Sequence, residues 1–477
     1  MSALEVLQQS FPASQFLLPG SIEFEKQNST YLAAQQSEIK PAAIFQPSTK
    51  EDVSKFIQVI KHFTQQGENK FEFAVRGGGQ NPLPKCANIE KPGVTLDLAH
   101  LNEVNVKEGF VGVGAGARWG KVFDALDGTG LGVSGNRSSK AGIGGLALQG
   151  GLSFFSSREG FVSDNVLNYE IVLASGEIVN ANADENRDLW LALRGGNNNF
   201  GVVTRFDFRI FPQGPFWGGS VYYFGHSFPD QIDALVTELQ KEDATEDTHL
   251  MISIGFAAQF GPQAMCQNQI YYTQEVDQSP AVLEPFVSVT PQIDQMNSMR
   301  ALTLKEAASE QSMDAKQQKR CSYMNATVKA DTATLKAASE FYTSIVGTIN
   351  SVEGLVCSFT LQPYALSCLK KSTENSLGLN PSDGPLVSIL LLTYWDKSED
   401  DERIETTMKS VLEKIEKDSA ERRTAVPYKF FNYASSFQDP IGSYGADNKK
   451  KLQEASKKYD PEGIFQTSVP GGFKLFT

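Results

Sequence analysis

Three consecutive glycines at the end of a strand-like stretch constrain this chain more than any other feature. The run Phe71-Glu72-Phe73-Ala74-Val75 leads directly into Arg76-Gly77-Gly78-Gly79-Gln80-Asn81. Glycine has no Cβ, so the backbone N–H groups of such a loop can approach a bulky anionic ligand closely. The next side chain, Gln80, would then point at that ligand, and its neutral amide is too poor a nucleophile to form a covalent bond to it.

The residues before the glycines predict a β-α-β unit. Ala42–Phe45 is a short apolar strand, and Ser48 and Glu51 have the spacing of a capping box ahead of apolar residues at helical intervals. Gly67 would end that helix before the strand over Phe71–Val75. The glycine loop is therefore expected at the carboxyl end of a strand, where α/β folds usually bind ligands.

Length and composition bound the possible classes of protein. A chain of 477 residues is too long for one hydrophobic core and predicts two domains. The net charge of −13 and a pI near 5.0 argue against a nucleic-acid or anionic-membrane surface. No run of 18 apolar residues occurs, so no membrane-spanning helix is expected.

Metal binding and secretion are also not expected. The four histidines are scattered, without H-x-x-x-H or C-x-x-C spacing, so the sequence predicts no metal site. Five cysteines, an odd number, are typical of reduced buried thiols. No basic segment followed by an apolar run is visible at the N-terminus, so a cytoplasmic location is expected.

Beyond Pro212 the sequence becomes rich in strand-like runs. Strands are expected at Trp217–Phe224, His249–Phe260, Gln269–Thr273, Leu355–Leu361 and Leu386–Trp395, and helices at Lys305–Lys319 and Lys329–Val346. Strands interleaved with helices favour a second domain built on a mostly antiparallel sheet. The last fifty residues return to a glycine-rich, aromatic composition and are expected to fold back onto the first domain.

Two segments match nucleotide-binding glycine patterns, but neither has the required surroundings. Gly130–Gly135 fits G-x-G-x-x-G, yet a helix precedes it and polar, non-helical residues follow it. Gly142–Ala147 fits a looser variant without a β-α-β context. A Rossmann domain needs a strand before the loop and a helix after it, so it is the weaker interpretation.

Considered together, the glycine-rich segments indicate more than ordinary turns. They are Arg76–Gly79, Gly112–Gly116, Gly142–Gly145, Gly150-Gly151 and Gly195-Gly196. Each alone is typical of a tight turn, but five within about 120 residues favour backbone that approaches one extended ligand at several points.

The order of motifs along the chain is more specific than any single glycine pattern. R-G-G-G-Q-N is followed by V-G-A-G-A, G-I-G-G, G-G-L-S-F-F, D-N-V-L-N-Y-E-I-V-L-A-S-G-E-I-V-N-A-N and L-R-G-G-N-N-N-F-G-V-V-T, and the chain closes with N-Y-A, Q-D-P-I-G-S-Y-G, K-K-Y-D-P-E-G-I-F-Q and P-G-G-F-K-L. This order resembles the fungal FAD-linked oxidoreductases of the berberine-bridge-enzyme-like, vanillyl-alcohol-oxidase superfamily. The likeness is strongest in residues 41–212 and 428–477 and weakest between them.

The resemblance implies an α+β fold made of two parts. A two-part PCMH-type FAD-binding domain would comprise residues 1–212 and a C-terminal segment, 428–477. An α+β substrate domain with a large antiparallel sheet would comprise residues 213–427 and roof the isoalloxazine ring.

The resemblance also implies cofactor contacts, residue by residue. The pyrophosphate would be held by Arg76, Gly77, Gly78, Gly79, Gln80 and Asn81. The flavin would be lined by Gly142, Gly144 and Gly145. The cofactor would also be contacted by Asn165 and Val203, and the ring would be approached by Asn432 and Tyr433.

The chain departs from its family where relatives attach flavin covalently. Many relatives have histidine in place of Gln80, and some have a second attaching cysteine at the position of Ser138 or Arg137. Neither residue is present, so FAD is expected to be held without a covalent bond.

Ala141 aligns with a position that controls oxygen access, and its small side chain favours O₂ as electron acceptor. Lys140 would lie either near the flavin pyrimidine or in solvent.

Tyr433 and Tyr394 are the candidate catalytic bases, because a tyrosine can take the hydroxyl proton while hydride leaves for flavin N5. Four aromatic residues are expected to line an apolar substrate pocket, namely Trp217, Phe224, Tyr271 and Tyr364.

The leading hypothesis is a non-covalent FAD oxidase acting on a small apolar secondary metabolite. The alternatives are a non-redox isomerase or cyclase that uses FAD structurally, and an inactive ligand-binding relative.

Overall fold

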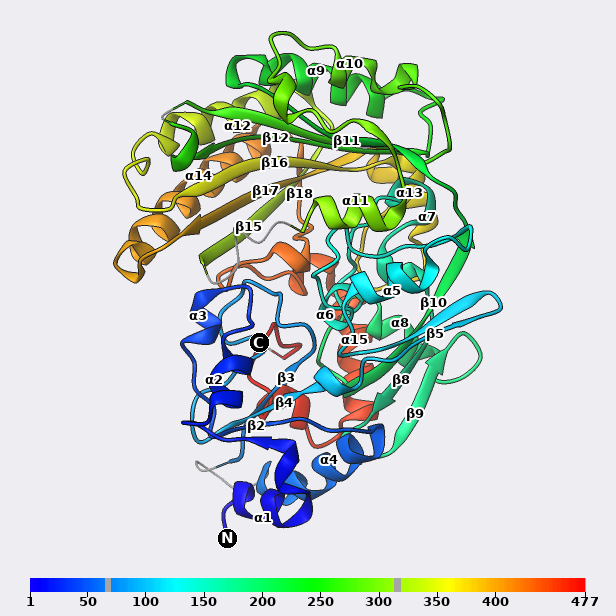
Figure 1. The fold of residues 1–477 in the computed structure, drawn as a ribbon, viewed down its shortest axis with the longest axis vertical. Helices are drawn as coiled ribbons and strands as arrows, with labels where there is room; N and C mark the ends of the chain where they lie inside the picture. Colours follow the sequence, from blue (N-terminus) through cyan, green and yellow to red (C-terminus); the bar gives the residue numbers. More distant parts are fainter. Residues whose placement is uncertain (65–69, 262, 313–318, 477) are drawn as a thin grey trace.

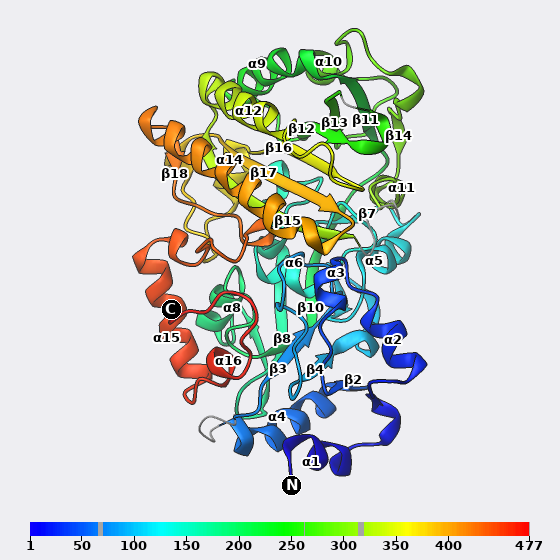
Figure 2. The same ribbon diagram turned by 90° about the vertical axis from the view of Figure 1, so that its left-hand side faces the viewer.

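Three β-sheets and surrounding helices form an α+β structure, which confirms the expected fold class (Figure 1). The computed structural model describes residues 1–64, 70–261, 263–312 and 319–476. Two sheets lie in one half of the molecule and the third, with eight strands, lies in the other half (Figures 1 and 2). Short elements complete the structure: α1 (Ala3–Ser10), β1 (Phe16–Leu17), α2 (Ile22–Asn28), α3 (Ala34–Ser37), α7 (Ser156–Glu159), α10 (Glu284–Val287), α13 (Leu366–Lys371) and α16 (Ile464–Thr467).

The predicted β-α-β unit is present in the first sheet, whose order is β1-β2-β4-β3. Strand β2 (Ala43–Phe45) leads into α4 (Lys50–Thr64) and then β3 (Phe73–Arg76), and both strands run parallel to β4 (Val94–Asp97) between them. The capping box is formed one residue later than predicted, by Thr49 and Asp52. Gly67, expected to end this helix, lies outside the described residues.

The second sheet is built around the long strand β10. Its strands are β5 (Val104–Lys107), β6 (Phe110–Gly114), β10 (Val202–Pro212), β8 (Val166–Val172) and β9 (Ile178–Asn182), with β7 (Leu131–Val133) also paired to β10. Helices α5 (Trp119–Leu126) and α8 (Arg187–Leu193) pack beside it. The G-x-G-x-x-G match falls on β7, and the next helix, α6 (Gly144–Leu148), starts only at Gly144, so this segment has no Rossmann geometry.

The third sheet is antiparallel throughout, as expected for the second half of the chain. In spatial order its strands are β14 (Arg300–Leu302), β11 (Phe216–Phe224), β13 (Met265–Tyr272), β12 (Thr248–Ala257), β16 (Val356–Tyr364), β17 (Leu386–Trp395), β15 (Arg320–Lys329) and β18 (Ala425–Val426). The sequence interpretation missed β15, because its polar residues Ser322, Asn325 and Thr327 are buried and conceal the alternation.

The helix expected over Lys305–Lys319 is shorter in the structure. Helix α11 (Leu304–Glu310) begins with a capping box of Thr303 and Glu306, and residues 313–318 of the expected helix lie outside the described residues.

One face of the eight-stranded sheet is apolar and covered by helices. Helices α9 (Phe228–Leu239), α12 (Thr332–Val346) and α14 (Asp401–Glu421) pack on this face and enclose a core with strand residues such as Ile252 and Phe359 (Figure 2). Successive side chains of a strand point to opposite faces. The other face, which carries Ser253 on β12 and Thr360 on β16, therefore points toward the half that contains the glycine loops.

The C-terminal segment returns to the N-terminal half. Helix α15 (Ala446–Tyr459) lies beside α8, where Lys458 and Tyr459 both bind Asp188 at 2.7 Å. The backbone N–H of Phe73 donates to the carbonyl of Ser468 at 2.8 Å. The larger of the two main hydrophobic cores accordingly combines residues from both ends of the chain.

Two further expectations concern the whole described chain. The five cysteines are free, and four of them are buried while Cys86 is partly buried. None of the helices in the described ranges is long and apolar enough to cross a lipid bilayer.

Asn325 attaches the returning segment to the large sheet, and its removal tests that attachment. Its fully buried side chain accepts from the Phe430 N–H at 2.8 Å and donates to the Phe430 carbonyl at 3.0 Å. Asn325→Ala leaves the buried Phe430 N–H without its partner and removes one of the two bonds to the Phe430 carbonyl, which also accepts from the Tyr433 N–H at 3.0 Å, so we expect a loss of about 1–3 kcal/mol in the free energy of unfolding. Urea denaturation measures this loss. The control Asn105→Ala, at an exposed site on β5, is expected to change stability little, and equal stability of the two variants would contradict the assignment.

Candidate functional site

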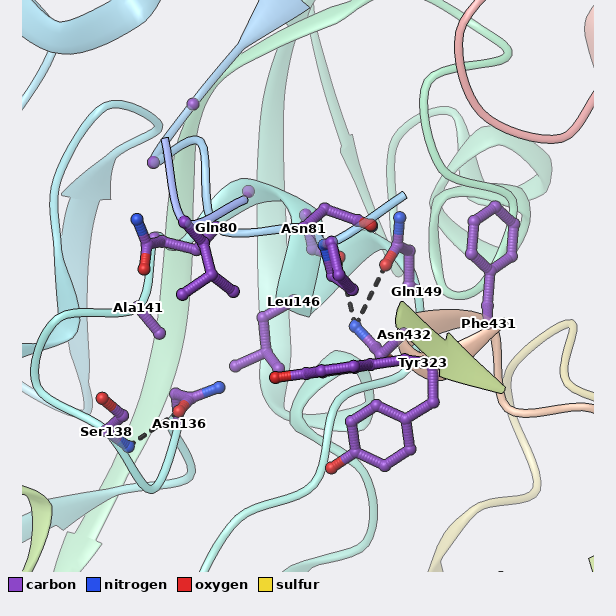
Figure 3. A pocket seen from close by; sticks show the side chains of 18 of the residues that line it. Gln80, Asn81, Asn136, Ser138, Ala141, Leu146, Gln149, Tyr323, Phe431 and Asn432 are labelled. Atoms are coloured by element: carbon purple, nitrogen blue, oxygen red, sulfur yellow. Dashed lines mark hydrogen bonds between the residues drawn. The ribbon is translucent and has the colours of Figure 1, made fainter. Parts of the chain in front are cut away.

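A cavity of about 780 Å³ lies between the glycine loops and the polar face of the eight-stranded sheet. This volume is in the range of about 300–1,000 Å³ that is usual for small-molecule and cofactor sites. The loops after β3 and β7 and helix α6 line one side of the cavity, and β12, β13, β15, β16 and β17 line the other. Figure 3 shows side chains from both sides and from the C-terminal segment pointing into this space.

The floor of the cavity is a point where two glycine loops touch through their backbones. A Cβ placed on Gly78 would lie 2.5 Å from the Cα of Gly142, and a Cβ on Gly142 would lie 2.6 Å from the Cα of Gly78. Gly79 has φ +63°, which an L side chain rarely adopts. By contrast, a Cβ on Gly145 would meet no atom within 4 Å. Glycine therefore permits the contact between the loops and also keeps bare backbone facing the cavity.

The glycines of the other three segments, predicted to approach an extended ligand, pack against protein atoms instead. Gly114 and Gly116 pack against the backbone of Leu101 and Leu98, and Gly196 packs against the carbonyl of Ala192. Gly150 and Gly151 pack against neighbouring side chains, and neither these glycines nor Gly195 line the cavity. Of the five glycine segments, those at 76–79 and 142–145 place glycines in the cavity lining, Gly112–Gly116 contributes only Ala115, and Gly151 acts indirectly by donating its N–H to Asn432.

Most of the site residues expected from the sequence line this cavity. They are Gly77, Gly78, Gly79, Gln80, Asn81, Ser138, Lys140, Ala141, Gly142, Gly144, Gly145, Val203, Tyr394, Asn432 and Tyr433. Which of them contact a cofactor stays a prediction.

Arg76 and Asn165, also expected to contact the cofactor, do not line the cavity. The guanidinium of Arg76 is buried, lies 3.8 Å from the centre of the Tyr31 ring and pairs with Asp97 at 3.8 Å. The Asn165 amide donates to two backbone carbonyls and accepts from Arg209 at 2.7 Å. Both side chains are engaged in contacts within the first half of the molecule, so neither is positioned to contact a ligand in this cavity.

The C-terminal segment supplies a fixed amide to the cavity. The Oδ1 atom of Asn432 accepts from the N–H of Gly151 at 3.1 Å, and its Nδ2 donates to Gln149 at 3.1 Å (Figure 3). These bonds determine the orientation of the Asn432 amide. Gln149 was not among the residues predicted from the sequence.

The two candidate catalytic tyrosines belong to separate hydrogen-bonded groups. The Tyr433 hydroxyl accepts from Arg137 Nη2 at 2.8 Å and donates to Gln362 at 3.2 Å. The hydroxyl of Tyr394 is hydrogen-bonded to that of Tyr323, and their rings are nearly perpendicular, at 84°. Burial raises the pKa of both Tyr394 and Tyr323 above that of a free phenol, so both keep their protons at neutral pH. Tyr394 is thus better suited to donate a hydrogen bond than to act as a base.

The roof of the cavity is more polar than expected. None of Trp217, Phe224, Tyr271 and Tyr364 lines the cavity, so the predicted apolar pocket is wrong in its residues. The roof is lined instead by hydroxyl and amide side chains together with a few apolar ones: Ser253, Gln267, Gln269, Ser358, Thr360 and Gln362, with Met251, Leu390 and Leu392. Alternation along the strands could have identified these residues, since each lies two positions from another of the same face.

The charges around the cavity are one-sided. Arg118, Arg137 and Lys140 line it, whereas no Asp or Glu does so within the described ranges. The whole chain carries a net charge of −13, so this cationic lining is opposite in sign to the rest of the protein. Such a site favours a ligand that carries negative charge.

Gln80 and Ser138, the positions where the resemblance implied covalent attachment in relatives, carry polar side chains. Among the described residues, the Gln80 amide makes one long contact, of 3.5 Å to the Gly79 carbonyl. Ser138 Oγ lies 3.0 Å from Ser312 Oγ, and its backbone N–H donates to Asn136 at 2.7 Å. Gln80 and Ala141 lie on the same side of the cavity (Figure 3).

Comparison with known proteins identifies the family. Residues 41–182 match the family model described as FAD binding domain. The chain is 35% identical over 461 residues to the FAD-dependent monooxygenase tpcD of Cochliobolus heterostrophus, covering 94% of this chain and 87% of that protein. It is 33% identical over 478 residues to the FAD-dependent monooxygenase FUP4 of Fusarium proliferatum, covering 95% and 90%. The chain belongs to the family of FAD-binding oxidoreductases that includes these FAD-dependent monooxygenases.

A solved structure shows the same fold for this oxidoreductase. The carbohydrate oxidase from Microdochium nivale superposes with a TM-score of 0.80 at 19% identity, covering 100% of both chains. The residues around the cavity fit the FAD that this family binds, because the two glycine segments leave backbone exposed where a Cβ would intrude and the described lining is free of carboxylates.

Substituting Gly78 tests whether the contact between the two loops holds the floor together. In Gly78→Ala the new methyl would lie 2.5 Å from backbone atoms of Gly142, so the loops must separate. We expect a loss of about 1–3 kcal/mol in stability and a lower Tm. Gly347→Ala is the matched control, because its Cβ would meet nothing within 4 Å. A Gly78→Ala variant that melts together with the control would contradict this role of the loops.

Proposed function

We propose that this protein is an FAD-dependent oxidase that holds FAD without a covalent bond and oxidises a small, oxygenated secondary metabolite, with O₂ as electron acceptor. The observation that carries the proposal is the cavity in which bare glycine backbone and cationic side chains lie on one side and hydroxyl and amide side chains on the other. The polar roof replaces the apolar substrate expected from the sequence.

Each side of the cavity would hold a different molecule. The loop Gly77–Gly79, with Arg118 nearby, suits the pyrophosphate, because backbone N–H groups and a guanidinium both bind phosphate oxygens. Gly142–Gly145, Val203 and Asn432 suit the isoalloxazine ring. The roof residues of β12, β13 and β16 would bind the substrate's oxygen atoms. When bound, FAD supplies the acceptor for a hydride at flavin N5.

The chain's own residues would manage the proton that leaves the substrate. Tyr433 is the better candidate of the two tyrosines, because burial raises the pKa of Tyr394 and keeps its proton in place, whereas the Tyr433 hydroxyl accepts from the Arg137 guanidinium at 2.8 Å. Of the two protonated hydroxyls of Tyr394 and Tyr323, one donates to the other, and the accepting one would donate to a substrate oxygen. Ala141 would leave space for O₂.

The absence of a covalent bond follows from the chemistry of two side chains. Gln80 and Ser138 stand where the resemblance places the attaching histidine and cysteine, and neither a neutral amide nor an aliphatic alcohol is nucleophilic enough to form such a bond. We expect acid precipitation of the purified yellow protein to release all of its flavin into the supernatant. Flavin fluorescence that stays with the denatured protein on a gel would contradict this expectation.

The variant Gln80→His tests whether the side chain at position 80 faces the flavin 8α-methyl group. If Gln80 faces the 8α-methyl group, the imidazole is expected to bond to it, and intact mass spectrometry of the denatured variant would show added FAD. Gln267→His, on the roof, is the matched control and is expected to stay unmodified. A Gln80→His variant that binds FAD but never gains mass would show that the loop points elsewhere.

Anaerobic titration with oxygenated aromatic and polyketide metabolites tests the redox reaction itself. We expect the visible absorbance of oxidised flavin to disappear on addition of substrate, and to recover with release of H₂O₂ when O₂ is admitted. The product should have lost two hydrogens. A product of unchanged mass without flavin bleaching would support an isomerase or cyclase instead. A product that gains one oxygen atom would match the name monooxygenase carried by the relatives tpcD and FUP4.

A further inference from the structure

Arg137 extends a positive charge from the glycine side of the cavity to the roof strand β12. It follows β7 in the loop that also carries Ser138, and its side chain is only partly buried. Its Nη2 donates to the Tyr433 hydroxyl at 2.8 Å, and its Nη1 lies 3.2 Å from the Met251 sulfur on β12. A thioether is a weak acceptor, so most of the five guanidinium donors have no strong partner among the described residues.

No acidic side chain of the described chain neutralises this charge. None of the ion pairs among the described residues includes Arg137, although Arg158, Arg205 and Arg209 on the same half of the molecule each pair with a carboxylate. The nearby His249 does not supply a negative charge either. Burial, followed by the charge of Arg137, holds the pKa of His249 well below its usual range, so this imidazole is neutral.

A charged group that is removed from water is normally paired or hydrogen-bonded. The surroundings of Arg137 offer a sulfur, a phenol and, through the phenol, the Gln362 amide. This arrangement orients the guanidinium without balancing its charge. The geometry therefore leaves an anion-binding position open at the cavity wall.

The cofactor is not the natural partner of this guanidinium. A second arginine, Arg118, is closer to the proposed pyrophosphate loop, because its Nη1 would be 3.8 Å from a Cβ on Gly78, and it also donates to the Lys140 carbonyl. Arg137, in contrast, is held by residues of the roof strands and of the C-terminal segment. Arg118 is therefore the better candidate for binding the pyrophosphate.

We propose that the substrate carries an acidic oxygen, as a carboxylate, phenolate or enolate, and that the Arg137 guanidinium binds it. This inference rests on the proposed function, because it names the substrate class of the same site. A guanidinium presents paired donors that match two adjacent oxygens, so compounds with a carboxylate, or with a phenolate beside a carbonyl, should fit best.

Binding of small probes to the FAD-loaded protein tests this substrate class without a known substrate. Salicylate, benzoate and the enolate of 1,3-cyclohexanedione are titrated while the flavin spectrum is followed, each against its neutral counterpart (salicylamide, benzamide and cyclohexanone). We expect at least one anion to bind about tenfold tighter than its neutral counterpart, and Arg137→Gln to remove this preference. Arg137→Lys, which keeps a charge but not the paired donors, should retain part of it.

The matched control is Arg187→Gln, which removes an exposed arginine paired with Glu374 at 2.6 Å far from the cavity lining. This control is expected to keep the full preference for anions. A thermal unfolding scan of each variant shows whether it is folded.

Three outcomes would overturn the inference. The first is a wild-type protein that binds no anion better than its neutral counterpart. The second is a preference that survives in Arg137→Gln. The third is an Arg137→Gln variant that folds but purifies without flavin, since the guanidinium would then serve the cofactor. A wild-type protein that takes up no FAD at all would instead contradict the proposed function, so the two failures are distinguishable.

Discussion

The direct backbone contact between Gly78 and Gly142 is the constraint on which the site depends. It joins the loop after β3, in the first sheet, to the loop before α6, near the second sheet. Any side chain at either position would separate the two loops. Because the two loops meet, their exposed backbone forms one continuous floor under the eight-stranded sheet, and a single extended cofactor can lie along it.

The roof follows from the period of two along antiparallel strands. On β12 the apolar residues Leu250, Ile252 and Ile254 face the helices, which places Met251 and Ser253 over the cavity. The same alternation on neighbouring strands gathers amides and hydroxyls into one polar surface. The C-terminal segment then closes the site, since Asn325 fixes it to the sheet and Asn432 and Tyr433 enter the cavity from it.

The sequence pattern predicted those elements whose structure depends on residues that are neighbours along the chain. The strand that leads into the glycine loop and the limits of β17 follow from the alternation of apolar residues, and they agree with the structure. The roof, the missed strand β15 and the lack of an ion pair for Arg137 among the described residues could not be derived, because they depend on which distant segments meet. Arg76 shows another limit of motif reading, because it lies in the most conspicuous motif and yet its side chain turns inward to Tyr31 and Asp97. A motif locates a loop more reliably than it tells which of its side chains face the ligand.

The most direct test of this account is a crystal structure of the purified yellow protein. The account predicts electron density for FAD along the backbone of Gly77–Gly79 and Gly142–Gly145, with the isoalloxazine ring beneath the roof strands and no density joining it to Gln80 or Ser138. Density for the flavin at another place, or a continuous bond from the ring to either side chain, would contradict it.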